Sequence, residues 1–273
     1  MEASIDPPLV LLAPRVTDDS VRIWKAAIDV RWPVQRLASW RVPADLVGSN
    51  RDCVIYAEPL FAEAVADQIG LILLEPPPDW LPGLPERFVQ RKVFSTTLAE
   101  ARKIHGPYFV KPAEGKVFEA RVYGGPDELP DSSQVDDGLT VLVSEPVTWQ
   151  LEVRCFVLNG RVATLSPYWR AGQLAEAVDG SWPFHHGEEA QALEFARMVL
   201  EGVAVPPAFV LDIGITAERG WAVVEGNPCW GAGLYGCTPR EALHTARRAV
   251  RRQAALTENE KNWVSPRVRA RLR

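Results

Sequence analysis

Residues 209–228 read FVLDIGITAERGWAVVEGNP, and they form the most informative part of the sequence. Two apolar runs flank a short polar segment, a pattern that predicts a β-hairpin. With Glu218 and Arg219 as a two-residue turn, Asp212 lies directly opposite Glu225. Because side chains alternate along a strand and paired residues share a face, both carboxylates then point to the same side of the sheet.

The facing carboxylates of this hairpin indicate a metal site. Like charges opposite each other destabilise a sheet, and a divalent cation reverses that cost, because Mg²⁺ selects hard oxygen ligands. Asn227 lies two residues past Glu225 on the same face and adds an amide oxygen. We therefore expect Asp212, Glu225 and Asn227 to hold Mg²⁺. The alternative is a solvated sheet face with unrelated polar residues.

Two further segments carry side chains suited to a nucleotide. In residues 151–158, LEVRCFVL, apolar residues alternate with Glu152 and Arg154, which suit ribose hydroxyls and phosphate oxygens respectively. In residues 109–116, FVKPAEGK, Lys111 ends an apolar strand and Lys116 follows in a loop, an arrangement that suits a polyphosphate. Taken alone, the first pattern is also typical of a surface ion pair and each lysine of plain surface.

The remaining chain alternates apolar runs with amphipathic segments, which favours an α/β protein. Prolines are dense between positions 75 and 85 and predict a boundary there, since so many cannot lie inside a helix or a central strand. Strands are expected at 9–13, 53–57, 71–74, 88–94, 108–111, 139–144 and 151–158. Helices are expected at 21–28 after a start at 17–20, at 60–69, from Ser95 or Thr96 to Ile104, at 188–200 and at 239–255.

Composition excludes several classes of protein. The chain has 273 residues and a net charge of −5, from 30 Lys and Arg against 35 Asp and Glu, which argues against a primary nucleic-acid binder. Its four cysteines form no CxxC pair, so we expect no disulfide or zinc site and a cytoplasmic location. No run of eighteen apolar residues occurs, and the N-terminal residues lack a basic region, so neither a membrane span nor a secretory signal is expected.

Arginines near the C-terminus leave nucleic-acid binding as a less favoured alternative, because local basic character can bind phosphates even on an acidic protein. Four of them are expected on the last helix and four in the tail: Arg247, Arg248, Arg251, Arg252, Arg267, Arg269, Arg271 and Arg273.

Taken in order, these segments resemble the ATP-grasp superfamily. The resemblance runs from about residue 87 to residue 238 and rests on FVKP, a loop with a second lysine, LVSEPV, LEVRCFVLNG, FVLDIG and VVEGNP. The segment LEVRCFVLNG is similar to the Asp-Ile-Arg-Cys stretch of ribosomal-protein glutamate ligases. The whole layout is most similar to the bacterial and phage clade named for one arginine and two lysines.

The resemblance implies an α/β (α+β) fold of the ATP-grasp type. A small N-terminal α/β lobe, residues 1–86, would precede an ATP-grasp domain of residues 87–273. That domain would comprise a small flap subdomain, about 87–143, and a large metal-binding subdomain, 144–273, which clasp the nucleotide between them.

The resemblance also implies a role for each candidate residue. Lys111 would hold the α and β phosphates, and Lys116 would reach further along the phosphate chain. Glu152 would bind the ribose, and Arg154 would stabilise the transferring phosphoryl group. Arg91 and Arg154 are both candidates for the arginine of the clade. The adenine contacts would come from the hinge at Val143, Ser144 and Glu145, and the Mg²⁺ ligands would be Asp212, Glu225 and Asn227.

The activity implied is that of an ATP-dependent carboxylate–amine ligase, with ATP and Mg²⁺ as cofactors and an acyl phosphate as intermediate. Its substrates would be small molecules or peptides. Two alternatives remain: a kinase-type phosphoryl transfer, and a nucleotide-binding module without catalysis.

Overall fold

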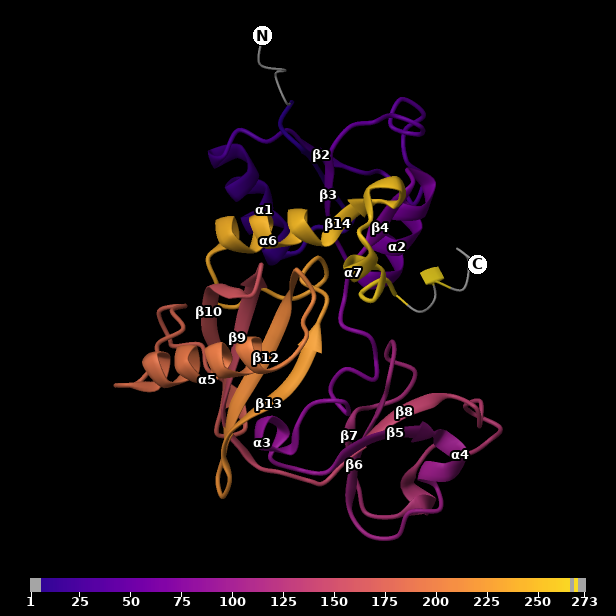
Figure 1. The fold of residues 1–273 in the computed structure, drawn as a ribbon, viewed down its shortest axis with the longest axis vertical. Helices are drawn as coiled ribbons and strands as arrows, with labels where there is room; N and C mark the ends of the chain where they lie inside the picture. Colours follow the sequence, from indigo (N-terminus) through magenta and orange to yellow (C-terminus); the bar gives the residue numbers. More distant parts are fainter. Residues whose placement is uncertain (1–5, 266–267, 270–273) are drawn as a thin grey trace.

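The computed structural model describes residues 6–265 together with 268 and 269, and its strands form four sheets (Figure 1). A parallel sheet of three strands belongs to the N-terminal part of the chain, and sheets of four and five strands follow. We call the four-stranded part the small subdomain and the five-stranded part the large subdomain. No helix in the described part of the chain is long and apolar enough to cross a membrane.

The N-terminal lobe is built around a parallel sheet in the order β2-β1-β3. Every residue of β1 and β3 is buried, as expected where both faces of a parallel sheet are covered. Thr17 caps α1 through a reciprocal pair of hydrogen bonds with Ser20, so the predicted helix start is confirmed. The elements are β1 (Leu9–Leu12), α1 (Asp18–Asp29), β2 (Val34–Arg36), β3 (Cys53–Tyr56), α2 (Pro59–Gln68) and β4 (Leu71–Leu73).

The small subdomain is an antiparallel sheet in the order β5-β8-β6-β7 with its own apolar core. Its elements are β5 (Val93–Thr97), α4 (Leu98–Ala101), β6 (Tyr108–Pro112), β7 (Arg121–Tyr123), η1 (Pro126–Glu128) and β8 (Thr140–Ser144). The strand expected at 88–94 is wrong at its start, because Phe88 and Val89 end the short helix α3 (Glu86–Val89) and are buried in the core of the large subdomain. The helix expected from Ser95 or Thr96 begins later, since Thr97 is its cap.

The large subdomain is an antiparallel sheet in the order β11-β10-β9-β12-β13. The alternation expected for residues 151–158 is confirmed: the apolar set on β9 is buried in one core, which also contains residues of α5. The opposite face carries the polar residues described below. The elements are β9 (Trp149–Leu158), β10 (Arg161–Arg170), β11 (Gln173–Leu174), α5 (Glu188–Gly202), β12 (Ala208–Thr216) and β13 (Gly220–Asn227).

The last part of the chain ties the N-terminal lobe to the large subdomain. Helix α6 (Pro239–Ala249) contacts α1 and β3 as well as β9, β10 and β12, and it lies between the two parts in Figure 1. The helix expected at 239–255 ends early, because β14 (Val250–Arg252) pairs with β4 of the N-terminal lobe. Two short elements follow, η2 (Gln253–Ala255) and α7 (Glu258–Lys261).

Candidate functional site

The hairpin of β12 and β13 places Asp212 opposite Glu225, as predicted, but by a different route. Thr216 pairs with Gly220, so the turn contains three residues and not two. A bulge at Val224 inserts one extra residue into β13 and restores the expected pairing beyond it. The turn prediction was therefore wrong, and the carboxylate pairing was right.

The pairing of four strands lines up polar residues across the sheet. Ser166 on β10 pairs with Arg154 on β9, Arg154 pairs with Asp212 on β12, and Asp212 pairs with Glu225 on β13. Glu152 and Asn227 lie two residues from members of this row and therefore share its face. We call these six residues the polar row. The structure thus brings the predicted metal ligands together with the predicted ribose and phosphoryl residues.

Arg154 and Asp212 form a buried ion pair in the centre of the row. Arg154 Nε and Nη2 donate to Asp212 Oδ1 and Oδ2 at 3.0 and 2.7 Å. Asp212 is fully buried and Arg154 is 8 % exposed. The guanidinium also lies over the rings of Tyr168 and Tyr235, at 5.3 and 4.9 Å from their centroids, and the two rings stack on each other. Arg154 is therefore held rigidly, with its charge matched by Asp212.

Glu225 connects the row to the small subdomain. Lys111, on β6, donates a short hydrogen bond to Glu225 Oε2. Burial raises the pKa of Glu225, but Lys111, Asn227 and Arg154 together outweigh burial and hold that pKa below its usual value. Asn227 Nδ2 donates to Glu225 Oε1 at 2.8 Å and to Asp212 Oδ2 at 2.9 Å. A lysine and an amide thus hold two carboxylates close together.

The donor set of the hairpin fits Mg²⁺. Asp212 and Glu225 supply carboxylate oxygens, and the Asn227 amide carries an oxygen opposite the amino group that now bridges them. In the described part of the chain no group of three or more His, Cys, Asp and Glu residues forms a metal site. Two carboxylates and one amide leave room for the water and phosphate ligands that Mg²⁺ retains.

Glu152 is partly buried on the same face. Burial raises its pKa to about 7, and the hydrogen bond that Tyr168 donates to it opposes this rise only in part. Glu152 therefore titrates near neutral pH, whereas an exposed glutamate is ionised there. Sequence reasoning did not reveal this partner of Glu152, because the two residues lie sixteen positions apart on different strands.

The hinge between the subdomains is held by Arg91. Its side chain is 7 % exposed and donates to Ser144 Oγ at 3.1 Å and to the carbonyls of Val223 and Val224 at 2.7 and 3.1 Å. Arg91 thus satisfies the carbonyl of the bulged residue and joins β13 to the end of β8. Glu145 points toward Arg219, with which it forms a 2.8 Å ion pair. The backbone of Glu145 is engaged as well, because its amide donates to the Lys92 carbonyl at 3.0 Å and its carbonyl accepts from Ser144 Oγ at 2.9 Å.

The remaining lysine and the C-terminal arginines lie outside this network. Lys116 is exposed in the loop between β6 and β7. Arg247 pairs with Asp52, and Arg248 and Arg251 both pair with Glu260. Arg252 donates to the carbonyls of Ile69 and Arg51. Arg251 and Arg252 lie on β14 and not on a helix. Three of the tail arginines, Arg267, Arg271 and Arg273, lie outside the described residues.

The chain is similar in fold to several proteins of known structure. Two solved structures with related folds are D-cycloserine synthetase DcsG, at 15% identity and a TM-score of 0.53, and a RimK domain ATP-grasp protein from Sphaerobacter thermophilus DSM 20745, at 13% and 0.54. They cover 88% and 89% of this chain, and the matches span 99% and 97% of their own chains. The ATP-grasp ligase PsnB, solved with a minimal precursor, Mg and ADP, matches at 14% identity and a TM-score of 0.45, over 86% of this chain and 93% of its own. No curated protein matches the chain.

The fold, a mixed α/β arrangement with several sheets, is of the ATP-grasp type. The model that matches describes an ATP-grasp domain, family 2 of the clade named for one arginine and two lysines, and it covers residues 88–245, more than half of the chain. The chain therefore belongs to this family, and both the expected family and the expected fold class are confirmed. Members of the ATP-grasp family are generally ATP-dependent ligases.

Proposed function

We propose that the chain is an ATP-dependent carboxylate–amine ligase that binds Mg-ATP between its small and large subdomains. The observation that carries this proposal is the contact of Lys111 with Glu225. It brings a cation of the small subdomain to the paired carboxylates of the large one. A magnesium polyphosphate has the charges to occupy this position, because its phosphates attract the lysine and its metal attracts the carboxylates.

Each polar residue then has a role in binding. Lys111 leaves Glu225 and pairs with the α and β phosphates, while Asp212, Glu225 and Asn227 are the residues that would hold Mg²⁺. Glu152 accepts hydrogen bonds from ribose hydroxyls, and the hinge at Val143, Ser144 and Glu145 meets the base. Bound Mg²⁺ neutralises phosphate charge and so favours transfer of the γ-phosphoryl group.

The reaction proceeds in two transfers. An oxygen of the substrate carboxylate attacks the γ-phosphorus and the bond to the β-phosphate oxygen breaks, giving an acyl phosphate and ADP. The nitrogen of an amine then attacks the acyl carbon, phosphate leaves, and the nitrogen loses a proton, giving an amide. Phosphoryl transfer depends on positioning and charge neutralisation, so the guanidinium of Arg154 and the ammonium of Lys116 suffice without a nucleophilic side chain.

The test is release of ADP from Mg-ATP, screened with carboxylates, amino acids and short peptides. Adding hydroxylamine should trap the acyl phosphate as a hydroxamate. Lys111→Met should abolish ADP release, whereas Lys103→Met should not, because Lys103 pairs with Glu100 at an exposed position and not with the paired carboxylates. ADP release without hydroxamate, and with a phosphorylated hydroxyl product, would favour a kinase instead. Failure of the chain to bind Mg-ADP would remove the proposal.

A further inference from the structure

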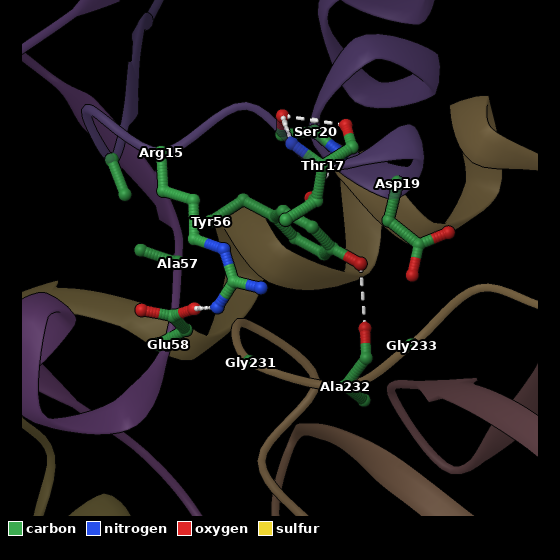
Figure 2. A pocket seen from close by; sticks show the side chains of 11 residues that line it. Arg15, Thr17, Asp19, Ser20, Tyr56, Ala57, Glu58, Gly231, Ala232 and Gly233 are labelled. Atoms are coloured by element: carbon green, nitrogen blue, oxygen red, sulfur yellow. Dashed lines mark hydrogen bonds and ion pairs between the residues drawn. The ribbon is translucent and has the colours of Figure 1, made fainter.

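A pocket outside the polar row lies between the N-terminal lobe and the loop that follows β13 (Figure 2). Its walls are the segments after β1 and β3, the first turn of α1 and the backbone of residues 231–233. It is open to solvent on one side, and its cavity volume is about 100 Å³. This volume is below the ~300–1,000 Å³ typical of small-molecule sites, so the pocket suits only a small ligand that stays partly in contact with solvent.

Few polar side chains of this pocket are free to contact a ligand. The hydroxyls of Thr17 and Ser20 take part in the cap of α1. The Tyr56 hydroxyl donates to the carbonyl of Ala232 at 2.5 Å and so secures the loop to the N-terminal lobe. The charged side chains that remain are Arg15, Glu58 and Asp19.

These charges are arranged at two ends. Arg15 pairs with Glu58 at 3.1 Å, and their side chains are 75% and 58% exposed, so a ligand can exchange with this pair at small cost. Asp19 lies on the other side of the Tyr56 ring in Figure 2. Its Oδ2 accepts from the amide of Leu234 at 3.1 Å, and its Oδ1 pairs with Arg22 at 3.4 Å. A third of each of these two side chains is exposed, so a ligand ammonium can take the place of Arg22. A cation at one end and an anion at the other match a molecule with both charges.

The Asp19 end of the pocket adjoins the phosphoryl site. The carbonyl of Gly233 accepts a hydrogen bond from Arg154 Nη1 at 3.0 Å. A Cβ at Gly233 would lie 3.5 Å from Asp19 Oδ2 and 3.6 Å from Arg154 Nη1, so a single glycine separates the two side chains. A group bound by Asp19 is therefore next to the guanidinium proposed to hold the transferring phosphoryl group, and a group bound by Arg15 is further away.

We infer that this pocket binds the amine substrate of the ligase and that this substrate is a free α-amino acid. Its ammonium pairs with Asp19, at the end close to the reaction, and its carboxylate pairs with Arg15 in place of Glu58. The role of this ligand as the amine substrate rests on the proposed function. The binding itself depends only on the pocket.

Calorimetric titration of the full chain with the standard free amino acids, one at a time, tests the binding. At least one should bind, and its amide and its N-acetyl derivative should bind about tenfold or more weakly, because each lacks one of the two charges. Asp19→Asn and Arg15→Ala should weaken binding to a similar extent. The asparagine keeps an oxygen for the Leu234 amide, so the loop stays in place.

Two matched variants control for surface charge. Asp18→Asn changes the exposed neighbour of Asp19 on the same helix turn, and Arg41→Ala removes an exposed arginine outside the pocket. Both should bind as the unchanged chain does. Absence of binding by every free amino acid, equal binding of the N-acetyl derivative, or unchanged binding by Asp19→Asn would overturn the inference.

The outcome is separable from that of the proposed function. Amino-acid binding with no ADP release would support the pocket and contradict the ligase. ADP release that requires a carboxylate and an amine, but is unaffected by Asp19→Asn and Arg15→Ala, would support the ligase and overturn the pocket.

Discussion

Replacing Glu225 by glutamine should change nucleotide affinity in opposite directions with and without Mg²⁺. In the structure Lys111 is engaged by Glu225, and the two side chains are 24% and 29% exposed. Without Mg²⁺, the phosphates of ADP compete with Glu225 for this lysine and are repelled by the carboxylate. Glu225→Gln removes both effects, so ADP should bind more tightly. With Mg²⁺, the same change removes a ligand, so ADP should bind more weakly.

The size of the effect follows from the charges. Two unit charges ~4 Å apart interact by about 4 kcal/mol at an effective dielectric constant of ~20. Because both side chains are partly exposed, solvent reduces this to roughly 1–2 kcal/mol. The gain in affinity without Mg²⁺ is then about 5- to 30-fold.

Titration of ADP by calorimetry, in EDTA and in excess Mg²⁺, measures both effects. Glu218→Gln is the matched control, because Glu218 is exposed in the turn of the same hairpin and its replacement should alter neither affinity. If Glu225→Gln weakens ADP binding equally in both buffers, the competition between Glu225 and phosphate for Lys111 does not exist.

Three further predictions concern stability. Asp212→Asn should lower the melting temperature, measured by calorimetry, by roughly 6–20 °C, since removing one partner of a buried ion pair costs about 3–5 kcal/mol. The double variant that also carries Arg154→Met should recover part of this loss, because it no longer buries an unpaired charge. Glu152 binds a proton more readily in the folded than in the unfolded chain, so wild-type stability should fall as pH rises from about 4.5 to about 7. Glu152→Gln should abolish that fall, of order 2 kcal/mol, and identical pH profiles of melting temperature for both proteins would contradict it. Gly214→Ala should destabilise the chain by about 1–3 kcal/mol in denaturant titrations, because its Cβ would lie 2.6 Å from a backbone carbonyl of β9. An unchanged unfolding midpoint would contradict this, since it would mean that the strands move apart at no cost in free energy.

The sequence predicted the polar row better than its surroundings. The direction in which a strand residue points can be predicted from the alternation of apolar and polar neighbours along the same strand. For this reason Arg154 and Asp212 were assigned to the correct faces of their strands, and the two residues pair in the structure. The pairing of Asp212 with Glu225 held only because a bulge at Val224 compensates for a turn one residue longer than expected. The bulge could not be predicted from the neighbouring sequence, because it is stabilised from a distant part of the chain. Arg91 donates a hydrogen bond to the carbonyl of the bulged residue Val224.

Long-range contacts explain what was missed. The expected last helix ends at Ala249 because the next residues pair with β4, some 180 positions earlier. Phe88 was predicted to begin a strand over residues 88–94, but it lies in the short helix α3 and is buried in the core of the large subdomain. The pocket of Arg15 and Asp19 depends on a loop more than 200 residues away, as the hydrogen bond from Leu234 to Asp19 illustrates. Local patterns contain no information on such neighbours.

The most direct measurement is a crystal structure of the chain with Mn²⁺ in place of Mg²⁺ and a non-hydrolysable ATP analogue, with the metal located by anomalous scattering. We expect an anomalous peak within about 2.0–2.3 Å of oxygens from Asp212, Glu225 and Asn227, with Lys111 moved from Glu225 to the phosphates. A nucleotide bound elsewhere, or a metal without these three ligands while Lys111 still contacts Glu225, would contradict it.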